Sequence, residues 1–490
     1  MNGQANKSAV SPASGGHARA GLLFWWAIAL VLAPVRAGGQ PLPVQAVVAE
    51  KVRAFEKATG ARVGVSAIDL AAGKRAVAMR DRELLIPASN QKLLTGAFAL
   101  VRLGGDYRFA TGVFLTHDAD LLVFGGFDPT LGDPVLARAD RKSIYAELDR
   151  WAGAIAKTTR GGTAGDILVT VAGGANLFRH PDWPASRNHV RYQAPAARLN
   201  FHNNCFGATF TVSDGRITPA VAPASRFIAV HSSLRVGKGY WSLTSARDDS
   251  AVWLRGKVAG TTRVPVYAAA NNPPMLTGRV LAGRLMRAGV AFSGRVRAVD
   301  PAGIDWRRAR LICRTTTPLA KVMRRANKYS LNMASECMLL RAGDGTWSGG
   351  ARAMTAALSK AFDLPQGAMV ARDGSGLSRK NRVSPRAMAR LLAGVARRKD
   401  ASVLVDSLPR GGIDGTLARR MRGAAVRGRI AAKTGYIAGV SCLSGYVLGG
   451  DGRPRMAFSI MVNRMPGRVA PAKDLQDAIC AVLVGAADEK

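Results

Sequence analysis

A long β-type segment in the middle of the chain constrains its fold more than any other feature. Within 108–314, short apolar runs are broken by clusters of Gly and Pro, whereas both flanks carry apolar residues at helical spacing. The 490 residues also exceed the usual size of one compact domain. We therefore predict a split domain, formed by 38–107 and 315–490, that encloses a β-rich insert of two subdomains.

The two flanks predict a mixed α/β domain. Pro near the start and Gly after the end favour a helix at 90–103. Alternating apolar residues on both sides of Gly73 predict an antiparallel hairpin. The other helices are expected at 47–57, 319–340, 386–398 and 474–484, and the strands at 62–70, 75–79, 430–448 and 455–462.

The segment 1–37 has the pattern of an export signal. Lys7 and Arg19 precede the apolar run 21–34, and small residues stand at the positions that a signal peptidase reads before Ala37. The run is shorter than the roughly 20 residues that span a bilayer. We expect cleavage after Ala37 and export to the periplasm or cell-wall space. The alternative is an uncleaved anchor with loose membrane association.

The chain is strongly basic, with 70 Lys and Arg against 32 Asp and Glu, a net charge of +38. Three of the basic residues lie in the signal, so the mature chain would carry +35. Such a charge attracts polyanions. An exported protein rarely meets nucleic acid, so we expect anionic wall polymers or lipid headgroups as partners and no nucleic acid. The other interpretation is a composition that simply prefers Arg.

Cysteine and histidine usage argues against metal chemistry. Five cysteines without a CxxC pair predict single buried thiols rather than a disulfide framework or a zinc site. The histidines after the signal all lie in the insert, and none has a metal-binding spacing. We therefore expect no metal ion and no Ser-His-Asp triad. These histidines are His117, His180, His189, His202 and His231.

The first catalytic candidate is the pair Ser89 and Lys92, at the start of the predicted helix 90–103. Residues three apart lie on one face of a helix. A serine hydroxyl becomes a nucleophile when a base takes its proton, and a lysine can be that base if burial or a nearby cation lowers its pKa. The helix N-terminus also offers free N–H groups to an oxyanion. Alone, this motif arises by chance about once in such a chain.

The second candidate is Ser330 with Asn332, placed inside the helical stretch 319–340. The serine can pass a proton to a leaving nitrogen, and the asparagine can hold Lys92 and bond a substrate amide. The same spacing occurs at Ser186 and Asn188, in a loop of the insert. We favour Ser330 because it precedes an amphipathic helix and lies nearer the third motif.

The third candidate is Lys433-Thr434-Gly435, at the end of a predicted strand. A strand edge with a cation and a hydroxyl suits a substrate carboxylate, and glycine allows the backbone close to a ligand. Three such motifs in this order are typical of penicillin-binding proteins and class A β-lactamases.

With these motifs the chain resembles the D-Ala-D-Ala carboxypeptidase/endopeptidase family, penicillin-binding proteins with a large insert after the nucleophile. The resemblance spans nearly all of the mature chain and includes the long spacing of 238 positions from Lys92 to Ser330. The segments that carry it are 87–95, 125–131, 203–205, 373–379, 414–417 and 433–446.

This resemblance implies the penicillin-recognising serine hydrolase fold, an antiparallel sheet with helices on both faces. It implies attack by Ser89 on the penultimate D-Ala of peptidoglycan peptides and muropeptides, with Lys92 as base and Ser330 as proton relay. It also implies that Lys433 and Thr434 hold the terminal carboxylate and that the N–H groups of Ser89 and Tyr436 stabilise the oxyanion. No cofactor is expected, and β-lactams would act as inhibitors.

Two departures from the family pattern and two alternative functions remain. The family often has an acid near the stretch 169–178 of the insert, where this chain has none, which bears on the cross-link or side chain that the insert helps to read. The family usually has Thr or Ser where this chain has Tyr436, which bears on carboxylate binding. A serine β-lactamase or esterase could use the same site, although no deacylating glutamate motif is evident. A non-catalytic wall-binding protein would rely on charge alone, but Ser89, Lys92, Ser330 and Lys433 are intact. Carboxypeptidase and endopeptidase action are not separated by sequence.

Overall fold

The computed structural model describes residues 43–159, 164–171, 178–187, 189–292 and 294–488. The predicted export signal, 1–37, lies outside these residues. Across the described ranges, no helix is both long enough and apolar enough to cross a bilayer.

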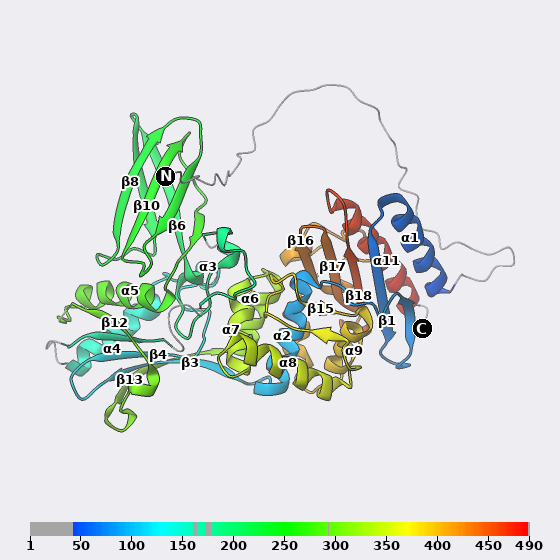
Figure 1. The fold of residues 1–490 in the computed structure, drawn as a ribbon, viewed down its shortest axis with the longest axis horizontal. Coiled ribbons are helices and arrows are strands. Elements are labelled where there is room, and N and C mark those ends of the chain that lie inside the picture. The colour runs from blue at the N-terminus through cyan, green and yellow to red at the C-terminus, as the bar shows by residue number, and fades with distance from the viewer. Residues whose placement is uncertain (1–42, 160–163, 172–177, 188, 293, 489–490) are drawn as a thin grey trace, which may run out of the picture.

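Both ends of the chain contribute strands to one antiparallel sheet with the order β16-β17-β18-β1-β2 (Figure 1). Strand β18 buries both faces: Phe458 and Ile460 face one core, and Ala457 and Met461 face the other. The strands are β1 Arg62–Asp69, β2 Arg75–Met79, β16 Ile430–Ile437, β17 Val440–Leu448 and β18 Pro454–Asn463.

Helices cover both faces of this sheet, which confirms the predicted α/β class. Helices α1 and α11 pack on one face of the sheet. Helix α9 packs on the other face, between the sheet and the group of helices around α2. Helix α2 is buried over most of its length, so it forms the centre of the larger core. The helices are α1 Val44–Thr59, α2 Gln91–Leu103, α6 Leu319–Lys328, α7 Asn332–Ala342, α8 Trp347–Phe362, α9 Pro385–Ala396, α10 Ala401–Val405 and α11 Ala470–Asp488, with a short hairpin of β14 Met369–Val370 and β15 Arg382–Val383.

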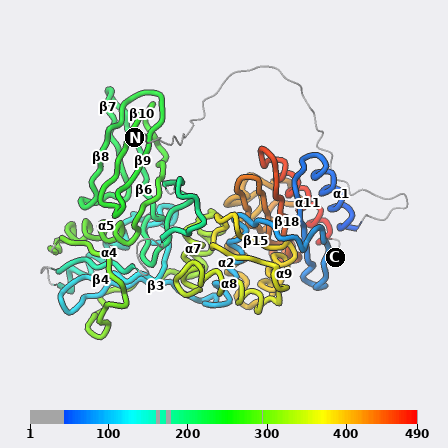
Figure 2. The backbone as a smooth tube through the Cα atoms, in the orientation of Figure 1, coloured from blue at the N-terminus to red at the C-terminus, as the bar shows by residue number. Residues whose placement is uncertain are grey.

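The central part of the chain forms separate sheets on the other side of the molecule, drawn in cyan to green in Figure 2. A five-stranded sheet has the order β12-β5-β4-β3-β13, and two three-stranded sheets have the orders β11-β6-β7 and β8-β10-β9. This arrangement supports the proposed division into a split domain and an insert at 108–314 with two parts.

The insert elements are β3 Arg108–Leu115, β4 Leu121–Gly125, α3 Pro134–Ala139, α4 Ala146–Thr159, β5 Ile167–Thr170, β6 Cys205–Ser213, β7 Arg216–Ala222, β8 Ala229–Val236, β9 Trp241–Ser245, β10 Ala251–Val258, β11 Val266–Ala269, α5 Pro273–Arg287, β12 Val296–Val299 and β13 Arg310–Pro318.

Two predicted elements are wrong in their continuity. The expected helix 319–340 is two helices, because Ser330 has a positive φ of 55° and the N–H of Leu331 bonds to the carbonyl of Arg325. Both helices bury one face in the same core, so the apolar spacing conceals the break. The expected strand 430–448 is a hairpin, β16 and β17, with Gly439 at φ 75° in its turn.

The five cysteines are free, as the sequence predicted. Four of them are buried, whereas Cys313, on β13, is only partly buried. The prediction of buried thiols is therefore correct for all but Cys313.

A buried ion pair joins the insert to the split domain. Asp133 caps the N-terminus of α3 and lies 2.5 Å from the guanidinium of Arg325 on α6, and both side chains are almost fully buried. Arg325 also lies over the ring of Tyr329, next to Ser330. A buried pair of this kind fixes the position of one element against another, because neither charge has water as an alternative partner.

Breaking this pair should be costly. Asp133→Asn keeps a capping side chain but leaves the charge of Arg325 buried without a counter-ion, so we expect a loss of about 3 kcal/mol in the free energy of unfolding. The matched control is Asp140→Asn, which removes the exposed ion pair to Lys321 between the same two helices and should cost at most about 1 kcal/mol. Thermal unfolding of both variants makes the comparison, and equal losses would contradict the assignment.

Candidate active site

Ser89 and Lys92 lie together, as their spacing predicted. Ser89 is in a single helical turn, Ala88–Asn90, that leads into α2. The Nζ of Lys92 donates to Ser89 Oγ at 3.0 Å, to Asn332 Oδ1 at 2.6 Å and to the carbonyl of Ser375 at 2.9 Å. The lysine is fully buried, while the serine is partly exposed.

The environment of Lys92 favours its neutral form. Burial lowers the pKa of Lys92 to about 7, although the nearby carboxyl groups of Glu336 and Asp373 act in the opposite direction. Near neutral pH a large fraction of this amine therefore has a free lone pair. A neutral amine 3.0 Å from a serine hydroxyl can accept its proton.

The second and third motifs complete the arrangement. Ser330, in the break between α6 and α7, lies 3.5 Å from Ser89 Oγ and accepts a hydrogen bond of 3.1 Å from the Nζ of Lys433 on β16. Burial, together with the charge of Lys92, holds the pKa of Lys433 well below its usual range. The hydroxyl of Ser330 thus connects Ser89 to a second buried amine.

Strand β16 passes close to the turn Ala88–Asn90, which carries the candidate nucleophile Ser89 and is called the nucleophile turn below. A Cβ on Gly435 would lie 2.8 Å from the carbonyl oxygen of Pro87, so only glycine fits this approach without a shift. Thr434 donates from its hydroxyl to Thr416 at 2.9 Å. Tyr436, the departure from the family pattern, has a side chain that is 62% exposed.

A buried carboxyl group positions the loop that supplies one of the hydrogen-bond acceptors of Lys92. Glu336, on α7, accepts hydrogen bonds from the N–H groups of Gly374 at 2.7 Å and Ser375 at 2.8 Å. Burial and the neighbouring charge of Asp373 raise the pKa of Glu336. The carbonyl of Ser375 is thereby presented to Lys92. Sequence reasoning missed Glu336, although an acid four residues after Asn332, on the same buried helix face, was a usable signal.

The loop after Ser375 touches the nucleophile turn directly. Gly376 has a φ of 85°, and a Cβ at this position would lie 1.8 Å from the carbonyl oxygen of Ala88. Asp373 fixes the loop by accepting from the N–H groups of Gly376 at 2.8 Å and Ser378 at 2.6 Å. The position of Ser89 therefore depends on this loop.

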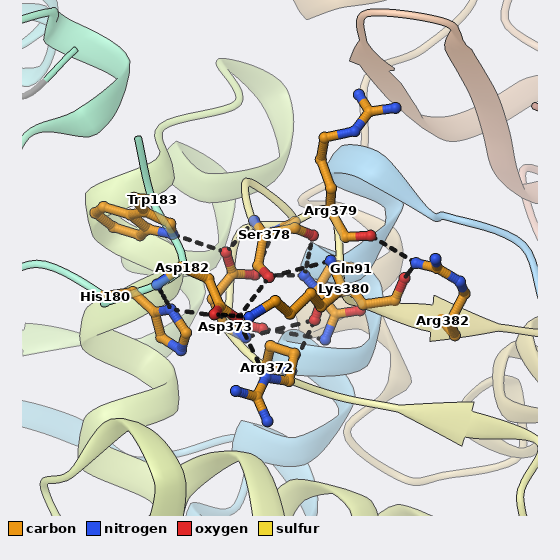
Figure 3. A network of polar contacts seen from close by, with 12 residues as sticks. Gln91, His180, Asp182, Trp183, Arg372, Asp373, Ser378, Arg379, Lys380 and Arg382 are labelled. Carbon is orange, nitrogen blue, oxygen red and sulfur yellow. Dashed lines mark hydrogen bonds and ion pairs between the residues drawn. The ribbon is translucent and has the colours of Figure 1, made fainter. Parts of the chain in front are cut away.

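The insert holds the same loop from the other side, as Figure 3 shows. The indole N–H of Trp183 donates to Asp373 at 2.9 Å. Asp182 accepts from Lys380 at 2.6 Å and from Ser378 at 3.0 Å. Burial alone would raise the pKa of Asp182, but hydrogen bonds from Lys380, Arg372 and Ser378 bring it to about 2.

A second insert contact reaches the catalytic asparagine candidate. The amide N–H of Asn332 donates to the carbonyl of Tyr192 at 2.8 Å. Asp182, Trp183 and Tyr192 have no motif that could have identified them, because their importance comes from contacts between distant parts of the chain. Of the alternative pair, Ser186 lies in a short helical turn, and Asn188 is outside the described residues. The described ranges contain no group of three His, Cys, Asp or Glu side chains placed to hold a metal ion.

Known proteins resemble this chain in sequence over most of its length. The sequence pattern of the D-Ala-D-Ala carboxypeptidase 3 (S13) family matches residues 44–484. The D-alanyl-D-alanine carboxypeptidase of Actinomadura sp. (strain R39) is 31% identical over 86% of this chain and 81% of that protein. D-alanyl-D-alanine carboxypeptidase DacB of Haemophilus influenzae is 24% identical over 82% of this chain and 86% of that protein.

Solved structures share the fold. Penicillin binding protein 4 (dacB) from Haemophilus influenzae has a TM-score of 0.73 at 21% identity, covering 88% of this chain and 99% of that one. The same protein complexed with a novel β-lactam has a TM-score of 0.69 at 21% identity, covering 89% of this chain and 99% of that one. The predicted fold class is confirmed.

The contact between Gly376 and Ala88 gives a test of the site. Gly376→Ala should lower both the melting temperature and the reactivity of Ser89, because the added Cβ displaces the nucleophile turn. Gly367→Ala is the matched control: it has a φ of 74° but open space around it, so it should show only backbone strain of about 1 kcal/mol. Thermal unfolding and labelling with a fluorescent penicillin would compare them. Equal effects on labelling would show that the clash is irrelevant.

Proposed function

This chain belongs to the D-Ala-D-Ala carboxypeptidase 3 (S13) family and is a serine-type D-alanyl-D-alanine carboxypeptidase of the penicillin-binding type, and we propose that Ser89 is its nucleophile. The observation that carries this assignment is the hydrogen bond of 3.0 Å from the buried Nζ of Lys92 to Ser89 Oγ. The substrate is the D-alanyl-D-alanine end of peptidoglycan peptides and muropeptides.

In the proposed acylation step, Ser89 Oγ attacks the carbonyl carbon of the penultimate D-Ala while Lys92 takes the hydroxyl proton. Asn332 helps to hold Lys92 in place, since its Oδ1 accepts from Nζ at 2.6 Å. The N–H groups of Ser89 and Tyr436 would stabilise the oxyanion. The bond to the terminal D-Ala then breaks and leaves an acyl-enzyme.

Ser330 is the proposed route of the proton to the leaving amine. Its hydroxyl lies between Ser89 Oγ and Lys433 Nζ, at 3.5 Å and 3.1 Å. Lys433 and Thr434, on the edge strand β16, would bind the terminal carboxylate, and an arriving anion would favour the charged form of Lys433. Water then attacks the ester carbonyl and releases Ser89. No cofactor enters this scheme.

The same acylation would trap a β-lactam, because ring opening leaves no amine that can depart. A homologous structure is described as complexed with a β-lactam, which supports this proposal. Carboxypeptidase and endopeptidase action share the acylation step and differ in the leaving group. Mass analysis of the products from purified muropeptides would distinguish them.

We also propose that the mature protein is exported and associates with anionic polymers or membrane surfaces. The net charge of +38, with an apolar segment near the N-terminus, supports both points. This association would be electrostatic, so it should weaken as salt shortens the Debye length from about 10 Å at 0.1 M to about 3 Å at 1 M.

The nucleophile assignment predicts the outcome of penicillin labelling. Fluorescent penicillin should label the wild-type protein covalently, Ser89→Ala should abolish the label, and Lys92→Ala should lose most of it because no base remains. Circular dichroism checks that each variant is folded, and Ser232→Ala, which changes an exposed serine on β8 of the insert, is the control that should keep full labelling. Full labelling of Ser89→Ala would show that another residue is acylated.

The pKa of Lys92 predicts a pH dependence. Because the neutral amine is the active form and its pKa is about 7, the rate of acylation should rise about tenfold per pH unit below this value and level off above it. Stopped-flow measurements of acylation, between about pH 5 and 9, give the profile. A rate that falls as the pH rises towards 7 would contradict a lysine base.

Tyr436 predicts a difference between substrates. Its ring is largely exposed, so Tyr436→Thr should not disturb the core. A threonine hydroxyl lies nearer the strand and can bond the terminal carboxylate, so kcat/KM on a D-Ala-D-Ala peptide should rise. Acylation by simple penicillins should stay within about tenfold, because the N–H of residue 436 is unchanged. A fall in both activities would show that the tyrosine itself contributes to the site.

A further inference from the structure

A pocket of about 660 Å³ shares no lining residue with the candidate active site. Its lining residues come from the β1–β2 hairpin, the C-terminal end of α8, and helix α9 with the two residues that follow it. Five of its eleven lining residues are arginine and none is acidic. The arginines are Arg75, Arg386, Arg390, Arg397 and Arg398.

The spacing of three of these arginines along the chain brings them to one side of α9. Arg386, Arg390 and Arg397 are at positions i, i+4 and i+11 of α9 and its C-cap, so they follow one face of the helix. Gly394 faces the same pocket, and a Cβ there would lie 2.3 Å from the ring of Phe362. Because residue 394 is glycine, no side chain occupies the part of the pocket next to it.

The charges of the pocket are not balanced. Three of the arginines have one carboxylate each within ion-pair distance. Within the part of the chain that the structure describes, no such carboxylate pairs with Arg386 or Arg397. Five guanidinium groups against three carboxylates leave a formal charge of +2 around the cavity. The pairs are Arg75 with Asp81, Arg390 with Asp363, and Arg398 with Asp400.

We propose that this pocket binds a linear polyanion that carries phosphate groups in series. Guanidinium groups match phosphate oxygens in geometry and retain their charge at all relevant pH values. The Cα atoms of Arg386 and Arg397 are about 16 Å apart along the helix, which suits two separate anionic groups better than one. A concave cavity also fits a chain better than the flat surface of a bilayer.

This site would give a location to the anion binding proposed above, and it is independent of catalysis. The mature chain has many exposed arginines, so diffuse attraction must be separated from binding in the pocket. Arg419 and Arg422 are exposed and have no ion pair among the described residues, so they provide a control with the same loss of charge. Neither pair of arginines belongs to the machinery around Ser89.

The experiment uses tripolyphosphate as the probe and isothermal titration calorimetry of the full chain at low salt. Arg386→Gln/Arg397→Gln should raise the Kd by about tenfold or more, because two charge-assisted contacts are lost. Arg419→Gln/Arg422→Gln should change it by less than about threefold, and 1 M salt should weaken binding to the wild type. Equal losses in the two double variants, or salt-independent binding, would overturn the proposal.

Vesicles of phosphatidylglycerol test whether the pocket binds the surface of an anionic bilayer instead of a linear polyanion. If the wild type sediments with them through Arg386 and Arg397 but does not bind tripolyphosphate, the pocket faces a bilayer and the proposal of a linear ligand is wrong. Penicillin labelling and the melting temperature should be unchanged in both double variants. These readouts separate failure of the pocket from failure of the Ser89 assignment, since labelling reports only the catalytic site.

Discussion

In the proposed mechanism Lys92 has to be buried and yet lose its proton easily, and the contacts around it are consistent with that requirement. Its three hydrogen-bond acceptors, Ser89 Oγ, Asn332 Oδ1 and the carbonyl of Ser375, are neutral oxygens. A direct carboxylate partner would stabilise the charged amine and raise its pKa. The neighbouring carboxyl of Glu336 is instead turned to backbone N–H groups, where it shapes the loop that supplies the third acceptor.

The insert contributes to this arrangement although it carries none of the three motifs. Trp183 and Asp182 hold the loop 373–380, and the carbonyl of Tyr192 orients Asn332. The buried pair of Asp133 and Arg325 fixes α6 against the insert just before Ser330. Ser330, with its positive φ, lies between the end of α6 and the start of α7, and each of these two helices has a contact to the insert. We therefore regard the insert as part of the site's support.

The spacing of apolar residues predicted α2, the β1–β2 hairpin and α9 to within a few residues, because each of these elements shows the periodicity of its type. It failed where the break in an element leaves the pattern unchanged. The helices on both sides of Ser330 face the same core, so their apolar positions continue across the interruption. Strand β17 is buried along its whole length and the first four residues of β16 are buried too, so neither strand shows the alternation that would have separated them at Gly439.

The sequence by itself determined the chemistry and its order along the chain. Ser89, Lys92, Ser330, Asn332 and Lys433 are recognisable because local spacing and residue type specify what each can do. Only the tertiary structure decided which groups surround them: the buried Glu336, the hold of Trp183 on Asp373, and the arginine pocket between α9 and the β1–β2 hairpin. These contacts join residues far apart in the chain. They depend on how sheets and helices pack, which short-range periodicity does not encode.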